Sequence, residues 1–170
     1  MRNRNVTMIT QGAIIAALYV VLTMLANAMG LANYVIQVRF SEALCIIPFF
    51  TVAAIPGLTI GCLISNLLTG AMFWDVLFGS LATLIGAIGT YLLRKHKFLM
   101  MLPPVIANAV IVPMVLRYGY GMTWEYEGMD WSIPYFTTTV GLGEIISVCV
   151  LGSVLLNALI PYKNIIFKEN

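Results

Sequence analysis

The sequence has few charged residues. Only 9% of its 170 residues are Asp, Glu, Lys or Arg, whereas 61% are hydrophobic. Soluble domains usually carry about a quarter charged residues, and one soluble core of this size could not bury so much apolar surface. The net charge of +2 offers no basic patch that would suggest a nucleic-acid partner. The composition therefore predicts an integral membrane protein that forms one compact all-α domain over residues 1–170.

Residues that carry chemistry are also scarce. The three cysteines, Cys45, Cys62 and Cys149, lie in apolar runs without CxxC spacing, so we interpret them as packed side chains. The one histidine, His96, belongs to a basic loop. No HExxH motif, serine–histidine pairing or phosphate-cradling GxxxxGK[ST] motif is present. We therefore expect no metal, no cofactor and no enzymatic activity of the chain itself.

Long apolar runs predict several membrane crossings. A helix needs roughly 20 residues to cross a hydrocarbon core of about 30 Å. The region 43–72 is too long for one crossing, and Pro56-Gly57 near its middle predicts a turn, because proline removes a helix hydrogen bond. The expected spans lie near 10–29, 41–55, 57–73, 75–93, 98–117 and 134–160.

The distribution of basic residues favours this division. Lys and Arg concentrate on the cytoplasmic side of membrane proteins. Six spans place all three basic groups on one side, whereas five spans would separate the middle group from the N-terminal one. These groups are Arg2 with Arg4, residues 94–97, and Lys163 with Lys168. The pattern predicts a six-transmembrane-helix bundle with both termini cytoplasmic and an outer loop at 118–133.

Small residues recur at four-residue spacing in several spans, as in Ala13-xxx-Ala17 and Gly57-xxx-Gly61. This spacing lets helix backbones approach closely. Packing within the chain is the simpler interpretation, and a docking face for a partner subunit is the alternative.

A few charged residues lie inside or beside the apolar spans. Ser41 is a good N-cap residue and Glu42 falls in the first helical turn, so Arg39 and Glu42 could simply form a capped helix start with a local ion pair. Glu144 lies about ten residues into the last span, too deep for a cap. Such a carboxylate is costly in a membrane and usually faces a bundle interior or a water-filled cavity.

Six spans place the starts of the second and fourth spans on the same outer side, which suggests an outward-facing pocket. A flat, nitrogen-rich ligand would suit it, because a carboxylate can accept two parallel N–H bonds and an aromatic ring can stack on the ligand. The asparagines have an alternative role as helix–helix hydrogen-bonding groups. The candidate substrate-binding residues are Arg39, Glu42, Asn66, Trp74, Asp75, Asn108 and Glu144.

The stretch VRFSEALCIIPFFTVAAIPGLTIGCLISNLLTG, followed by WDVLFGSLATLIGA, resembles the QueT family of queuosine-precursor transporters, and the similarity extends over most of the chain. These are substrate-binding S-components of energy-coupling factor (ECF) transporters. AIIAALYVVLT, residues 13–23, resembles the alanine-rich first helix by which S-components dock to the coupling subunit, which makes Ala13, Ala16 and Ala17 candidate docking residues.

The resemblance implies a prokaryotic plasma-membrane protein that captures a 7-deazaguanine (preQ1, preQ0 or queuine) for uptake. It also implies a coupling membrane subunit and two cytoplasmic ATPase subunits as partners. The alternatives are an S-component for another small heteroaromatic ligand, and a self-sufficient channel or proton-coupled carrier in which carboxylates such as Glu144 relay protons.

Overall fold

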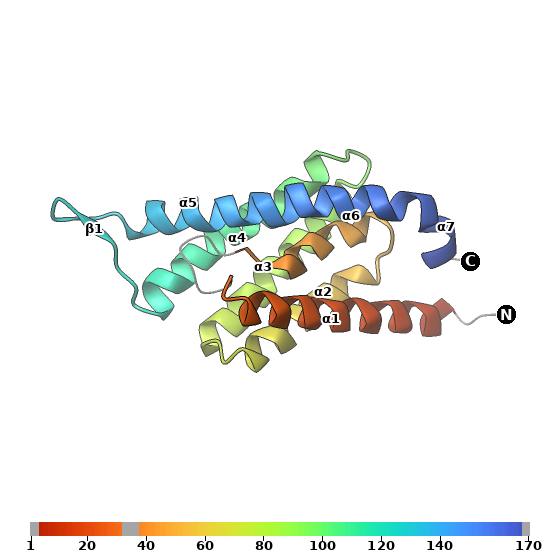
Figure 1. Ribbon diagram of the computed structural model, residues 1–170, viewed down its shortest axis with the longest axis horizontal. Coiled ribbons are helices and arrows are strands. Elements are labelled where there is room, and N and C mark those ends of the chain that lie inside the picture. The colour runs from red at the N-terminus through yellow and green to blue at the C-terminus, as the bar shows by residue number, and fades with distance from the viewer. Residues whose placement is uncertain (1–3, 32–37, 168–170) are drawn as a thin grey trace.

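The structure is a computed structural model that describes residues 4–31 and 38–167. Their regular secondary structure is helical except for one short hairpin (Figure 1). The α-helices are α1 (Arg4–Ala28), α2 (Ala54–Leu68), α3 (Phe73–Leu92), α4 (Leu102–Met114), α5 (Ser132–Glu144), α6 (Gly152–Leu159) and α7 (Lys163–Ile166). The 3-10 helices are η1 (Phe40–Phe49), η2 (Leu99–Met101) and η5 (Ile160–Tyr162). The π-helices are η3 (Val115–Gly119) and η4 (Ile145–Leu151), and the strands are β1 (Glu125–Tyr126) and β2 (Met129–Asp130).

Four helical stretches of the described chain are long and apolar enough to cross a membrane, namely Arg4–Ala28, Phe73–Leu92, Leu99–Gly119 and Ser132–Ile166. Two shorter apolar helices, Phe40–Phe49 and Ala54–Leu68, lie between the first two. The chain is therefore a helical, multi-pass membrane protein. The six segments occur in the predicted order, but six complete crossings and the cytoplasmic termini stay predictions, and Arg2 and Lys168 lie outside the described residues.

The short helix η1 occupies the centre of the bundle (orange in Figure 1). Every side chain from Ser41 to Pro48 is buried. It packs against α1, α3, α6 and η4. This central position explains why a ten-residue segment, too short to cross a bilayer of about 30 Å, nevertheless has a strongly apolar sequence.

The turn predicted at Pro56-Gly57 is wrong by a few residues. The chain leaves η1 at Phe50 and enters α2 at Ala54, so the break spans residues 50–53. Pro56 lies in the first turn of α2, where its missing N–H costs nothing because that donor has no intrahelical partner. Proline signalled the boundary correctly, but it stands just after the break.

Most of the small residues serve packing within the chain. A Cβ on Gly57 would lie 2.7 Å from the Gly12 carbonyl oxygen, so α1 and α2 touch through their backbones here. One turn later, a Cβ on Gly61 would lie 3.1 Å from the Ala16 Cα. Ala16 is consequently only 9% exposed, and its predicted role as a docking residue is wrong because α2 covers it. Ala13 and Ala17 lie on the exposed side of α1.

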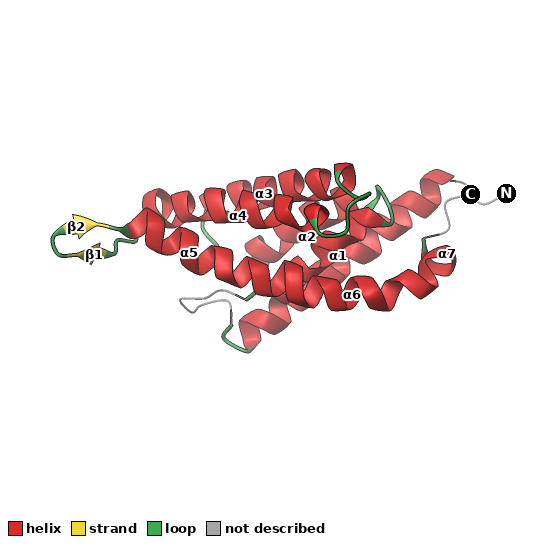
Figure 2. Cartoon of the chain, turned by 90° about the horizontal axis from the view of Figure 1, so that it is seen from above, coloured by secondary structure: helices red, strands yellow, loops and turns green. Residues whose placement is uncertain are grey.

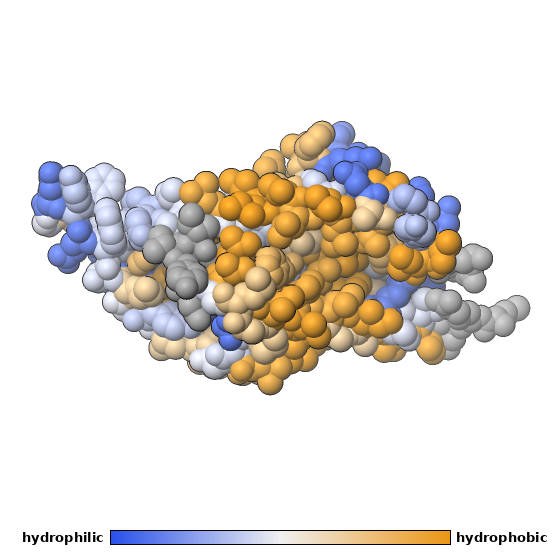
Figure 3. All heavy atoms as spheres, in the orientation of Figure 1, coloured by the Kyte–Doolittle hydropathy of each residue, from blue (hydrophilic) through white to orange (hydrophobic). Residues whose placement is uncertain are grey.

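The described chain ends lie together, and the hairpin lies at the opposite end of the bundle (Figures 1 and 2). The Gln11 side-chain amide donates a hydrogen bond to the Ile166 carbonyl (3.3 Å), and Phe50 stacks on Phe167 with 4.8 Å between ring centroids. Figure 3 shows an apolar surface across the middle of the molecule and a polar one over the hairpin. Chain ends at the same end of the bundle are what an even number of membrane crossings requires.

The loop predicted to face outward, residues 118–133, contains a short hairpin of two-residue strands. Glu127 and Gly128 at its tip have φ angles of 52° and 76°, as a type I′ turn requires. Arg117 forms an ion pair with Asp130 (2.7 Å). Asp130 also accepts hydrogen bonds from the backbone N–H and the hydroxyl of Ser132, and these bonds together with Arg117 lower its pKa to about 2. These contacts join the hairpin to η3, which continues from α4, and to the start of α5.

Candidate functional site

A polar cavity of about 320 Å³ opens where α1, α2 and α3 meet the end of α4. It contains three of the seven predicted site residues, Arg39, Asn66 and Asp75. The remaining lining residues are Thr23, Asn27, Thr69, Gly70, Ala71, Val112, Leu116, Tyr120 and Met122. The lining includes residues of the chain that precedes the hairpin, so the cavity belongs to the predicted outer half of the molecule.

Asp75 and Tyr120 form the polar rim of this cavity. The Tyr120 hydroxyl donates a hydrogen bond to Asp75 Oδ2 (3.2 Å) and accepts one from the Met72 backbone N–H (3.1 Å). Partial burial and the Asp75 carboxylate raise the pKa of Tyr120, which keeps this phenol protonated as a donor. Asp75 also lies in the first turn of α3, where the helix dipole favours a carboxylate. Sequence reasoning missed Tyr120, because a tyrosine in an aromatic outer loop carries no distinguishing signal.

Asn66 connects α2 to α3 beside Asp75. Its side-chain amide donates to the Asp75 backbone carbonyl (3.3 Å), and a Cβ on Gly79 would lie only 3.1 Å from its Nδ2. The helix–helix role that the sequence allowed for Asn66 is therefore present, although the same residue also lines the cavity.

Arg39 supplies the positive charge of the cavity. Its guanidinium interacts electrostatically with Asp75 and Glu42. Within residues 4–31 and 38–167, however, the ion pair closer than 4 Å is Arg117 with Asp130, so the local pair of Arg39 with Glu42 is not formed. The predicted Ser41 cap is also wrong. The helix begins without a side-chain cap, and Ser41 instead shares a hydrogen bond of 2.9 Å with Thr23 of α1.

Glu42 lies deeper than the cavity lining, three residues beyond Arg39 on η1. It is 2% exposed and accepts hydrogen bonds from the Tyr19 hydroxyl and from the Cys45 thiol (3.1 Å). Both of its oxygens therefore have protein partners. Glu42 is a structural acceptor at the centre of the bundle as well as a source of negative charge below the cavity.

Asn108 and Glu144 lie in the same buried layer. Asn108, on α4, is one helical turn from Val112 in the cavity lining, and its amide lies beside the Glu144 carboxylate. Glu42 also acts on Glu144 electrostatically. The structure thus groups Glu42, Asn108 and Glu144 beneath the cavity that holds Arg39, Asn66 and Asp75.

Both π-helices border this region. The segment η3 carries Leu116 of the cavity lining, and η4 begins directly after Glu144. Helical segments of π geometry are rare and occur frequently at functional sites, because they redirect side chains without ending the helix. Both segments therefore lie directly beside candidate site residues, η3 at the cavity lining and η4 at Glu144.

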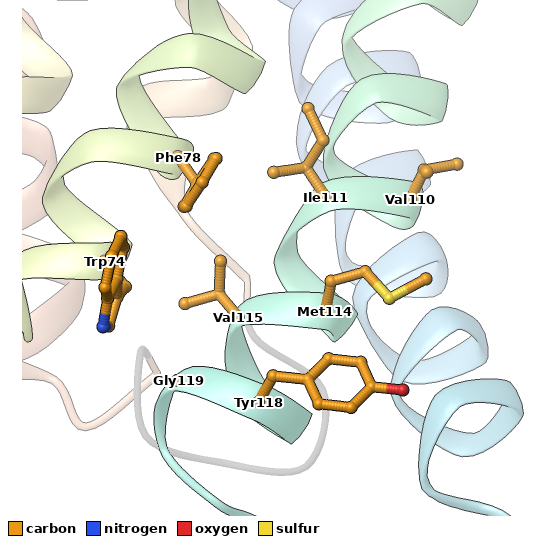
Figure 4. Close-up of a pocket in the computed structure, with 8 residues that line it drawn as sticks. All are labelled: Trp74, Phe78, Val110, Ile111, Met114, Val115, Tyr118 and Gly119. Carbon is orange, nitrogen blue, oxygen red and sulfur yellow. The ribbon is translucent and has the colours of Figure 1, made fainter.

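Trp74 lies elsewhere, in contrast to its predicted role as a stacking platform in the polar pocket. It lines an apolar groove of about 510 Å³ between α3 and the end of α4, together with Phe78, Val115 and Tyr118 (Figure 4). Since Trp74 and Asp75 are adjacent on a helix, their side chains point in different directions, and only Asp75 reaches the polar cavity.

The fold and the cavity define a class. A multi-pass helical bundle with a polar cavity at one end and buried carboxylates near it is typical of a membrane protein that binds a polar solute.

Comparison with known proteins identifies the family. The model of the QueT transporter family matches residues 9–161, and the chain therefore belongs to this transporter family and is not an enzyme. It is similar to the protein named queuosine precursor transporter QueT of Lactococcus lactis subsp. cremoris (strain MG1363), with 42% identity over 87 residues. This alignment covers 50% of the chain and 50% of that relative, so the match spans about half of the relative's length. No solved structure matches the chain.

Proposed function

We propose that the chain is the substrate-binding S-component of a prokaryotic ECF transporter and captures a queuosine precursor, a 7-deazaguanine, for uptake across the plasma membrane. In this proposal six helical segments cross the membrane, both termini are cytoplasmic, and the polar cavity faces outward. The coupling membrane subunit and two ATPase subunits supply the energy, since the sequence contains no phosphate-cradling loop.

The pairing of Asp75 and Arg39 in one polar cavity is the observation that carries the proposal. The cavity volume of about 320 Å³ lies within the range of small-molecule sites, roughly 300–1,000 Å³. The half-buried Asp75 carboxylate at the rim suits the cationic amine of the aminomethyl precursor. The name of the Lactococcus relative supports a queuosine precursor in particular.

The exposed side of α1 is the proposed docking face for the coupling subunit. Ala13 and Ala17 are exposed there, and small side chains permit close approach of a partner helix. A second candidate function, a proton-coupled carrier, is favoured by the neighbouring buried carboxylates Glu42 and Glu144. Such a carrier needs no ATPase subunits.

Two measurements on the same detergent-purified protein test the proposal. Calorimetric titration with the aminomethyl 7-deazaguanine is expected to show saturable binding to the isolated chain, with adenine as the matched non-ligand. Affinity purification from the native membrane is expected to bring the ATPase subunits along. Binding without ATPase subunits, together with proton-driven uptake by the chain alone, would favour the carrier.

Cysteine labelling tests the membrane orientation separately. In a cysteine-free background, a cysteine at position 127 is expected to react with an impermeant reagent from outside, and cysteines at 96 and 165 only after permeabilisation. Labelling of position 96 from outside would contradict six crossings with cytoplasmic ends.

A further inference from the structure

Three polar side chains in the buried layer have atoms without a protein partner. They are the amide nitrogen Nδ2 of Asn108, the carboxylate oxygen Oε2 of Glu144 and the hydroxyl of Ser147, each in a residue less than 9% exposed. Buried polar groups are nearly always hydrogen-bonded in folded proteins. Three such atoms in one place therefore require a common explanation, and nothing in the sequence had drawn attention to Ser147.

These atoms lie on three elements that contact one another, α4, α5 and η4. Asn108 on α4 adjoins Glu144 at the end of α5, and Ser147 follows Glu144 by three residues in η4, where both side chains are buried. The helices are close here, because a Cβ on Gly141 would lie 3.7 Å from the Ala109 Cβ. The row therefore presents an N–H donor, then a carboxylate acceptor, then a hydroxyl that can accept.

Resting on the proposed function, we infer that Asn108, Glu144 and Ser147 form a recognition row for the pyrimidine edge of a 2-amino-6-oxopurine-type ring. That edge presents a carbonyl acceptor, a ring N–H donor and an exocyclic amine donor in sequence. Asn108 Nδ2 donates to the carbonyl, Glu144 Oε2 accepts from the ring N–H, and the Ser147 hydroxyl accepts from the amine. Each unpaired atom thereby gains the partner that its chemistry requires.

This assignment orients the ligand. The pyrimidine edge points into the buried layer, whereas the five-membered ring and its 7-substituent point toward the cavity lined by Arg39, Asp75 and Tyr120. The site is consequently strict at the pyrimidine edge, where every contact is buried, and permissive at position 7, where about 320 Å³ is open. Aminomethyl, cyano and larger 7-substituents are all accepted, while a change at the ring N–H or the 2-amino group is rejected.

The test is a calorimetric titration of the purified protein with three ligands. They are 7-aminomethyl-7-deazaguanine, its 2-deamino analogue and its N1-methyl analogue. Wild-type protein is expected to bind the parent ligand about ten- to a hundredfold more tightly than either analogue, since each loses a hydrogen bond to a buried group. Equal affinity for all three would overturn the recognition row and leave the proposed function standing, whereas failure of the parent ligand to bind would count against the proposed function itself.

Ser147→Ala isolates one contact. It is expected to weaken binding of the parent ligand about tenfold and to leave the affinity for the 2-deamino analogue unchanged. Ser153→Ala is the matched control on the same continuous helix, because the Ser153 hydroxyl lies against Met101 instead. An equal loss for both ligands would show that Ser147 acts on the fold, and would overturn its assigned contact. If either variant unfolds, the comparison of ligands on wild-type protein still decides the proposal.

Discussion

Replacing Asp75 by Asn removes the negative charge from the cavity rim and keeps the shape of the side chain. In the proposed complex, Asp75 faces the cationic amine of the aminomethyl precursor, and hydrogen bonds to charged groups contribute about 1.5–3 kcal/mol. Asp75 is half-buried, which favours the lower part of this range. Since about 1.4 kcal/mol is a factor of ten, we expect affinity for the aminomethyl ligand to fall roughly tenfold.

The cyano precursor provides the internal control, because it lacks the charged amine. Its affinity for Asp75→Asn protein is expected to stay within about fivefold of wild type, as for a neutral hydrogen bond of about 0.5–1 kcal/mol. Titration of one protein preparation with both ligands measures the difference directly. Equal losses for the two ligands, or wild-type affinity for the aminomethyl ligand, would refute the placement of the amine at Asp75.

A second variant separates the charge from its local hydrogen bond. Tyr120→Phe removes the hydroxyl that donates to Asp75 Oδ2 but keeps the carboxylate. We expect it to affect the two ligands alike, because it frees Asp75 without discharging it. A selective loss of the aminomethyl ligand in Tyr120→Phe protein would mean that the phenol, and not the carboxylate, contacts the amine.

Three further predictions concern docking, packing and the hairpin. Ala13→Trp is expected to abolish transport without loss of substrate binding, because Ala13 is exposed. Ala16→Trp, at a buried position, should instead lower the melting temperature. Loss of substrate binding in Ala13→Trp protein would show that this face of α1 is not the docking surface. Gly61→Ala should lower the free energy of unfolding by about 1–3 kcal/mol, since its Cβ would lie 2.7 Å from the Tyr19 Cβ on α1. Gly141→Ala should be near neutral, because its Cβ would lie at an ordinary contact distance of 3.7 Å from the Ala109 Cβ. The pKa of Asp130 is lowered from 3.8 to about 2, so the Asp130 contacts anchor the hairpin fully above about pH 4 and are lost as the pH falls toward 2. Tryptophan fluorescence should change in that pH window. A change centred near neutral pH would contradict this assignment.

The sequence predicted the bundle well because its signals were strong and local. Long apolar runs and a shortage of charge indicate membrane helices, and Pro56 correctly indicated a boundary inside the region 43–72. The exact position of the break was wrong, because proline is tolerated within the first helical turn as well as before it. The 3-10 geometry of η1 and the π segments depend on tertiary packing and have no comparable signal in the sequence.

The candidate site was predictable in its charges but not in its neutral members. Buried carboxylates and a half-buried arginine are conspicuous in an apolar sequence, and the structure groups Arg39 and Asp75 around one cavity with Glu144 below it. The face that a residue adopts within a helix was harder to judge, which is why Trp74 proved to line a different groove. Tyr120 and Ser147 are residue types common on any helix or loop, so only the three-dimensional arrangement identifies them.

The central claim is that the cavity of Arg39 and Asp75 holds a queuosine precursor in the membrane. Mass spectrometry of small molecules released from protein purified in mild detergent tests it most directly, with Asp75→Asn protein purified in parallel. The proposed function predicts a 7-deazaguanine released from the wild-type protein, and the aminomethyl form depleted in the variant. A different heteroaromatic compound released from both proteins in equal amount would contradict both the substrate and the site.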